Sequence, residues 1–297
     1  MAMRLVFTFT LCFALVSCAG GEPTSVDRTV SVGTHSLHVR ERGSGSPTVV
    51  IDVGLGGSLE EWHALQDALA SDAFVVLYDR AGYGRSEAGP LPRDSGREMD
   101  ELRTMLDAAA IPGPFVLVGH SLGALNAQVF AGRYPEVTAG LVLLDPPPLA
   151  WVLGEGYVEL REVADGMTAE WQEMADRMAT STDSGERAEA AFLGTIASEH
   201  REMFGVSAKL AAAIETFADT PVTVIASGVP NPMFGDIAQE YQDYWANQSR
   251  EVAAKSARGK FIYAGESTHS LHRDAPDLVL EAIRALVTSD ATDQRAP

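Results

Sequence analysis

Short runs of apolar, often β-branched residues recur along the chain, and amphipathic segments separate them. The apolar runs span residues 48–53, 73–78, 115–118, 140–144, 221–227 and 260–264. Segments with helical spacing of apolar residues follow at 60–70, 97–110, 124–131, 236–257 and 276–287. Because continuous apolar runs of this length are typical of strands buried on both faces, the alternation predicts an α/β fold. Its mostly parallel sheet should carry helices on both faces.

The two ends of this pattern differ from its middle. Residues 29–43 alternate between apolar and polar positions, which predicts two more strands with a turn near Gly33 and a sheet of eight strands. Residues 149–220 contain no convincing strand, and tryptophans and methionines lie there among many charges. We therefore expect a core formed by residues 29–148 and 221–290, with residues 149–220 inserted as a helical lid.

Length and composition agree with this picture and exclude one class of partner. The 297 residues allow one large α/β domain or two small ones, and 46% hydrophobic residues are ample for a core. The formal charge of −19 disfavours nucleic acid, whose phosphates require clustered lysine and arginine.

The N-terminus has the pattern of an export signal. Arg4 precedes a mostly apolar run over residues 5–16, which is too short to span a membrane comfortably. The run ends in Leu15-Val16-Ser17-Cys18, which resembles the lipobox of bacterial lipoproteins. That resemblance implies a signal peptide over residues 1–18, acylation of Cys18, a tether over residues 19–28 and a lipid anchor in the membrane of the bacterial cell envelope, on its periplasmic or outer-membrane side. The alternative is a secretory signal cleaved near Ala19-Gly20, and in both cases the protein is exported.

The strongest chemical signal is Gly119-His120-Ser121-Leu122-Gly123. It lies between a predicted buried strand and a predicted helix, which is the setting of a nucleophile elbow. A sharp turn there holds the serine hydroxyl clear of the sheet, and glycine at both ends avoids collisions with neighbouring backbone.

Three further motifs accompany the elbow in order. They are Val53-Gly54-Leu55-Gly56-Gly57, the stretch Asp79-Arg80-Ala81-Gly82-Tyr83-Gly84-Arg85-Ser86, and a histidine loop at His269 before the last helix. Together the four motifs resemble those of the α/β-hydrolases over about residues 30–288. Two positions depart from the family pattern, since its glycine-rich loop usually begins His-Gly and its catalytic histidine usually follows glycine. The charges of the second motif are interpreted as structural, either solvated or paired.

A serine nucleophile requires a base, and the base requires a group that fixes its tautomer. Of the seven histidines, His269 directly follows a strand and matches the spacing that the resemblance implies, whereas His272 is interpreted as a satisfied surface residue. The third member of the triad stays open between Asp145, at the end of a strand, Asp236, and Asn231 or no such residue. In most family members it lies at the position of Asn231, and Asp145 is favoured because a strand end is rigid.

The oxyanion hole should consist of two backbone N–H groups. The elbow places Leu122 directly after the nucleophile, and the glycine-rich loop offers Leu55. The predicted activity is that of a serine hydrolase that cleaves an ester or related acyl bond of a small molecule through an acyl-enzyme, with no cofactor and no metal. The alternatives are a non-catalytic exported lipoprotein that binds ligands, and a perhydrolase, haloperoxidase or peptidase with the same fold.

Overall fold

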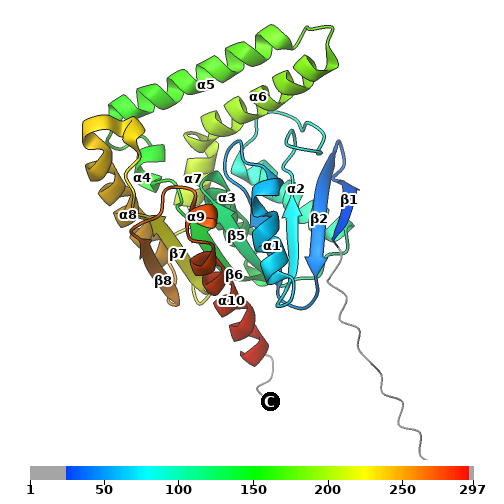
Figure 1. The fold of residues 1–297 in the computed structure, drawn as a ribbon, viewed down its shortest axis with the longest axis vertical. Coiled ribbons are helices and arrows are strands. Elements are labelled where there is room, and N and C mark those ends of the chain that lie inside the picture. Colours follow the sequence, from blue (N-terminus) through cyan, green and yellow to red (C-terminus); the bar gives the residue numbers. More distant parts are fainter. Residues whose placement is uncertain (1–24, 294–297) are drawn as a thin grey trace, which may run out of the picture.

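The computed structural model describes residues 25–293, with side chains up to residue 288. Eight strands form one sheet in the order β1-β2-β4-β3-β5-β6-β7-β8 (Figure 1). Their bounds are β1 Val26–Ser31, β2 Ser36–Gly43, β3 Thr48–Asp52, β4 Phe74–Tyr78, β5 Phe115–His120, β6 Thr138–Leu144, β7 Val222–Ser227 and β8 Gly259–Ala264. The pairs β1/β2 and β2/β4 are antiparallel and the other pairs are parallel, which confirms the predicted α/β fold class.

Successive residues of the central strands enter two different cores. Val49 and Ile51 of β3 are buried on one face of the sheet, and Val50 between them is buried on the other. Because side chains of a strand alternate between its two faces, a strand that is apolar at every position requires a cover on both. The continuous apolar runs in the sequence therefore indicate a sheet that is covered by helices on both faces.

The helices supply these two layers. On one face, α1 (His63–Leu69) and α10 (Pro276–Asp293) pack side by side, and the short α9 (Leu271–Asp274) precedes α10 (Figure 1). The opposite face is covered by α2 (Ser95–Ala108), α3 (Leu122–Arg133) and α8 (Ala238–Ala254). Three 3-10 segments complete the connections, at η1 Leu59–Trp62, η2 Pro135–Val137 and η3 Pro232–Ile237.

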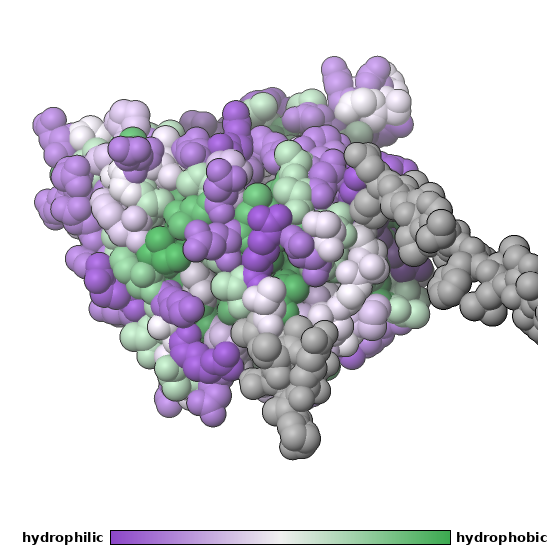
Figure 2. Space-filling model, turned by 60° about the horizontal axis from the view of Figure 1, so that its bottom comes forward, coloured by the Kyte–Doolittle hydropathy of each residue, from purple (hydrophilic) through white to green (hydrophobic). Residues whose placement is uncertain are grey.

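The chain between β6 and β7 is helical. It forms α4 (Leu149–Val152), α5 (Val158–Met178), α6 (Ser184–Met203) and α7 (Val206–Ala212). Helices α5 and α6 pack against each other as a long hairpin at one end of the sheet (Figure 1). In the described part of the chain, no helix combines the length and apolarity needed to cross a bilayer. On the face shown in Figure 2, apolar side chains form small patches that hydrophilic ones separate.

The structure corrects the predicted tether. Strand β1 begins at Val26, so the last three residues of the proposed tether over 19–28 belong to the sheet. They pair with β2, where Arg28 lies opposite Val39 and its guanidinium bonds Glu41 Oε1 at 2.6 Å. This edge strand is mostly exposed and carries polar side chains. The pattern of hydrophobic residues therefore does not predict that the strand extends to Val26. The signal peptide and Cys18 lie outside the described residues and stay predictions.

Gly123 shows how closely the elbow approaches the neighbouring strand. A Cβ atom built there would lie 2.2 Å from the Asp52 carbonyl oxygen, whereas a Cβ at Gly166, on the exposed face of α5, meets nothing within 4 Å. We expect Gly123→Ala to lower the free energy of unfolding by at least about 3 kcal/mol, because the backbone has to shift. Gly166→Ala should raise it by up to about 1 kcal/mol. Urea titration monitored by circular dichroism measures both, and similar values for the two variants would contradict the expected crowding.

Candidate active site

Ser121 occupies a strained turn between β5 and α3. Its φ and ψ angles are 53° and −118°, a conformation that non-glycine residues rarely adopt. Its N–H donates to the Leu144 carbonyl at 2.9 Å, which ties the turn to β6. A Cβ at Gly119 would lie 2.2 Å from the Gly123 carbonyl oxygen. Glycine at the start of the elbow thus permits the tight crossing of strand and helix that the sequence predicts.

His269 and Asp145 meet across the edge of the sheet where the parallel strands end. His269 lies on the loop after β8, and Asp145 directly follows β6. His269 Nδ1 donates to Asp145 Oδ2 at 2.6 Å. The Asp145 carboxylate is 2% exposed and also accepts the Ser227 N–H at 3.0 Å and the Ser227 hydroxyl at 2.7 Å. These bonds fix the proton of His269 on Nδ1 and leave Nε2 as the acceptor.

The other two candidates for the triad, Asp236 and Asn231, form no hydrogen bond with His269. Asp236 is exposed within η3. The Asn231 side chain accepts the Met233 N–H at 3.0 Å and caps the start of η3. The Asn231 side chain is therefore used to cap η3. It also borders the cavity described next.

Ser121, His269 and Asp145 line one cavity of about 280 Å³. Leu55 and the aromatic and methionine side chains of the lid and of the segment after β7 complete its walls. The full lining is Leu55, Ser121, Asp145, Trp151, Met167, His200, Met203, Ser227, Val229, Asn231, Phe234, Gln242, Trp245 and His269. None of these residues is lysine or arginine, and the single carboxylate is already bonded to His269.

The two residues predicted to form the oxyanion hole are Leu122 and Leu55. Leu122 directly follows Ser121 as the first residue of α3, where N–H groups have no partner within the helix. Leu55, from the glycine-rich loop after β3, is half-buried and borders the same cavity as Ser121. The loop and the elbow approach each other closely, since a Cβ atom at Gly54 would lie 3.4 Å from the Ser121 Cβ atom.

His200 is a cavity residue that the sequence placed only somewhere in the lid. It lies near the end of α6 and is 7% exposed. Thr168 donates its hydroxyl to the Ala164 carbonyl, so its oxygen accepts His200 Nδ1–H at 2.6 Å. Burial lowers the pKa of His200 to about 4, and it is therefore neutral near pH 7. A lone histidine in a helical insertion gives no local signal for this position.

Two more histidines support the loop of His269. His120 Nε2 donates to the His269 carbonyl at 2.8 Å. Burial, together with the neighbouring His269, holds the pKa of His120 well below its usual range. His272 stacks on Trp62 with ring centroids 4.2 Å apart and is buried, which corrects its interpretation as a surface residue.

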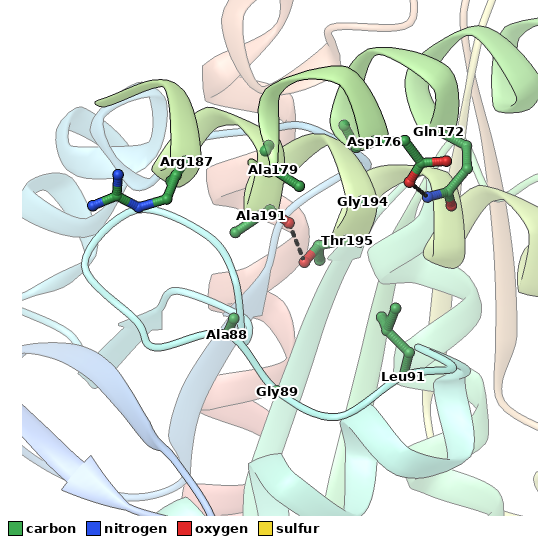
Figure 3. A pocket seen from close by; sticks show the side chains of 12 residues that line it. Ala88, Gly89, Leu91, Gln172, Asp176, Ala179, Arg187, Ala191, Gly194 and Thr195 are labelled. Atoms are coloured by element: carbon green, nitrogen blue, oxygen red, sulfur yellow. Dashed lines mark hydrogen bonds between the residues drawn. The ribbon is translucent and has the colours of Figure 1, made fainter. Parts of the chain in front are cut away.

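A second hollow, of about 310 Å³, lies elsewhere (Figure 3). Ala88, Gly89 and Leu91 border it on one side, and α5 and α6 border it on the other. Its lining consists mainly of small residues and contains none of Ser121, His269 and Asp145. It is therefore separate from the cavity at the elbow.

A serine on a strand–helix elbow, a histidine bonded to a strand-end aspartate and a glycine-rich loop beside them define the class of α/β hydrolases. The sequence profile of the alpha/beta hydrolase fold matches residues 47–269. The chain therefore belongs to the α/β-hydrolase fold family.

Individual relatives extend the comparison. The chain is 28% identical over 273 residues to the uncharacterized protein YqjL of Bacillus subtilis strain 168, covering 92% of this chain and 96% of that one. It is 43% identical over 103 residues to a putative carbamate hydrolase, RutD, of Klebsiella pneumoniae strain 342, which is 34% of this chain and 38% of that one. A solved structure of a putative lipase from Acinetobacter baumannii AYE superposes with a TM-score of 0.65 at 18% identity, covering 91% and 93% of the two chains. At that identity the structural match shows the fold alone.

The buried His200 predicts a specific loss of stability in acid. Between pH 6.5 and 4 the unfolded state binds a proton at this residue and the folded state does not, so stability falls as the pH falls through this window. Between pH 7 and 4 the wild type should lose about 3 kcal/mol more of its free energy of unfolding than His200→Gln. Denaturant titrations at both pH values measure the difference. Equal losses in the two proteins would show that the neutral, buried state of His200 does not limit acid stability.

Proposed function

We propose that the protein is a serine hydrolase that cleaves a carboxylic ester or a related acyl bond through an acyl-enzyme. The observation that carries this proposal is the hydrogen bond of 2.6 Å between His269 Nδ1 and Asp145 Oδ2, at the cavity that Ser121 also lines. A buried aspartate that fixes one tautomer of a histidine beside an elbow serine is the arrangement that activates a hydroxyl.

The proposed reaction has two halves. Ser121 Oγ attacks the acyl carbon while His269 Nε2 takes the hydroxyl proton, and Asp145 stabilises the imidazolium that forms. The N–H groups of Leu122 and Leu55 receive the negative charge that develops on the carbonyl oxygen. His269 then returns the proton to the leaving alcohol. In the second half a water molecule attacks the acyl-enzyme by the same route, releases the carboxylic acid and restores the Ser121 hydroxyl.

The cavity supports an uncharged, small acyl group as the substrate. It contains no lysine or arginine that would pair with a carboxylate, and the net charge of −19 repels anions at a distance. Its volume of about 280 Å³ lies just below the usual range of about 300–1,000 Å³ for ligand sites. Because the match to the carbamate hydrolase covers only 38% of that protein, the preference for an acyl ester rests on the cavity.

Labelling and mutation test the nucleophile and the acid together. A fluorophosphonate probe should label the wild type and leave Ser121→Ala unlabelled. Asp145→Asn should lower kcat on p-nitrophenyl acetate by about 10³- to 10⁴-fold, because the amide cannot stabilise the imidazolium. Asp236→Asn, an exposed carboxylate in the same region, is the matched control and should stay within about twofold. Absence of labelling would favour a non-catalytic binding protein, and the reverse ranking of the two variants would assign the acid to Asp236.

A pair of esters of similar length tests the charge preference. The kcat/KM for p-nitrophenyl butyrate should exceed that for p-nitrophenyl hemisuccinate by at least about 100-fold. The cavity provides no partner for the second carboxylate, and an unpaired buried charge costs about 3 kcal/mol or more. Stopped-flow release of p-nitrophenol measures both values in one assay. Comparable values for the two esters would mean that the acyl group lies outside this cavity.

A further inference from the structure

A buried arginine lies directly beneath the glycine-rich loop. Arg80, in the turn after β4, is 2% exposed, and each of its five N–H groups has an acceptor. Nη1 donates to Asp52 Oδ1 and to the Val53 carbonyl, both at 2.6 Å. Nη2 donates to the Gly54 carbonyl at 3.2 Å. The remaining two N–H groups, on Nε and Nη2, bond both oxygens of the Glu199 carboxylate at 3.0 and 3.1 Å.

One of these bonds acts on the proposed oxyanion donor. The Gly54 carbonyl and the Leu55 N–H belong to the same peptide unit, which is planar and trans, so the two groups point in opposite directions. Holding the oxygen on the Arg80 side therefore directs the N–H away from Arg80. A cation on the oxygen also polarises the peptide and strengthens its N–H as a donor.

Tyr83 holds the other side of Leu55. Its hydroxyl accepts the Gly56 N–H at 3.0 Å and donates to Glu199 Oε2 at 2.5 Å. Burial, with the negative charge of Glu199 second, raises the pKa of Tyr83 well above its usual value, so the hydroxyl keeps its proton. Both peptide units that flank Leu55 are thus bonded to side chains that share one carboxylate.

The cluster keeps the charges that this arrangement needs. Burial alone would lower the pKa of Arg80, but Glu199 and Asp52 raise it well above its ordinary value. Burial and the neighbouring Glu199 raise the pKa of Glu98 well above its usual range. The Arg80 guanidinium is hydrogen-bonded to two carboxylates, those of Asp52 and Glu199.

Glu199 comes from the lid, not from the sheet. It lies on α6, 119 residues after Arg80 in the sequence, and is 1% exposed. The same helix packs on the turn that carries Arg80 and Tyr83. A Cβ at Gly82 would lie 2.3 Å from Thr195 Oγ1, and Phe192 meets the Tyr83 ring edge-on with centroids 5.3 Å apart.

We propose that Arg80, Tyr83 and the lid residue Glu199 are positioning residues that orient the Gly54–Leu55 peptide as an oxyanion donor. The lid then contributes to the rate of the chemical step as well as to the cavity wall. In this loop the cation holds the carbonyls of Val53 and Gly54, the two positions at which other family members have His-Gly. The inference rests on the proposed function of Ser121.

Two conservative variants and one matched control test the proposal. Tyr83→Phe removes one hydroxyl and leaves every buried charge in place, and Glu199→Gln weakens the hold on Arg80. Glu101→Gln is the control, since Glu101 forms a comparable bidentate pair with the buried Arg93 at 2.8 and 2.6 Å and does not contact the glycine-rich loop. Circular dichroism first establishes a temperature at which all the proteins are folded.

We expect Tyr83→Phe and Glu199→Gln to lower kcat on p-nitrophenyl acetate by about 10- to 100-fold, with KM within about threefold. This is less than the roughly 10²- to 10³-fold loss that follows removal of a donor. Glu101→Gln should stay within about twofold in kcat. Unchanged kcat in Tyr83→Phe, or an equal loss in Glu101→Gln, would overturn the proposal. If Glu199→Gln does not fold, Tyr83→Phe decides the question alone.

Amide hydrogen exchange tests the positioning role independently of the proposed hydrolase activity. Exchange at residues 53–57 should accelerate at least about tenfold in Tyr83→Phe and remain unchanged in Glu101→Gln, whether or not the protein hydrolyses esters. Faster exchange without fluorophosphonate labelling of the wild type would support the positioning role and reject the serine hydrolase. Unchanged exchange in Tyr83→Phe, with labelling intact, would reject the positioning role alone.

Discussion

The register of the parallel strands is the constraint on which the site depends. Asp52 at the end of β3 pairs with Gly119 of β5, His120 pairs with Leu144 of β6, and Leu144 pairs with Ile225 of β7. The chain therefore leaves four neighbouring strands at one edge of the sheet, where ligand sites of open α/β sheets occur. A slip of one residue in any of these pairs would turn its side chains to the opposite face and move the following loop. The convergence of Ser121, Asp145 and His269 is thus a consequence of how the core packs.

Much of this arrangement could be predicted from local sequence, because the elements are short, apolar and separated by glycine-rich turns. The elbow at Ser121 carries its own pattern, and the spacing of His269 from the last strand is local as well. The choice between Asp145 and Asp236 could not be made from local sequence. The His269–Asp145 bond joins residues 124 positions apart, and only the pairing of β6 with β7 and β8 brings them together.

Burial of polar residues was the least predictable property. His272 lies in the short helix α9 among polar residues, but Trp62, whose ring stacks on it, is more than 200 positions earlier in the sequence. Arg80 stands in a turn of glycines and charges, where exposure is the ordinary expectation. Its partner Glu199 lies on helix α6. The amphipathic pattern of α6 does not indicate which of its residues faces the turn that carries Arg80. The sequence left the charges of this turn either solvated or paired, and the structure shows that Arg80 is paired and lies beneath the glycine-rich loop.

A buried ion pair is weak evidence for a role in stability, since an apolar replacement of similar volume often serves the fold equally well. The cluster around Arg80 is therefore better understood from what its bonds hold. Three of the five N–H groups of Arg80 are committed to the strand end and the loop that lead to Leu55, and two bind a carboxylate that arrives with α6. The same helix ends at the cavity wall with His200 and Met203. Substitutions that move α6 to change the cavity will also move the group that holds the loop. Under the proposed function, substrate preference would therefore be physically coupled to the rate of acyl transfer.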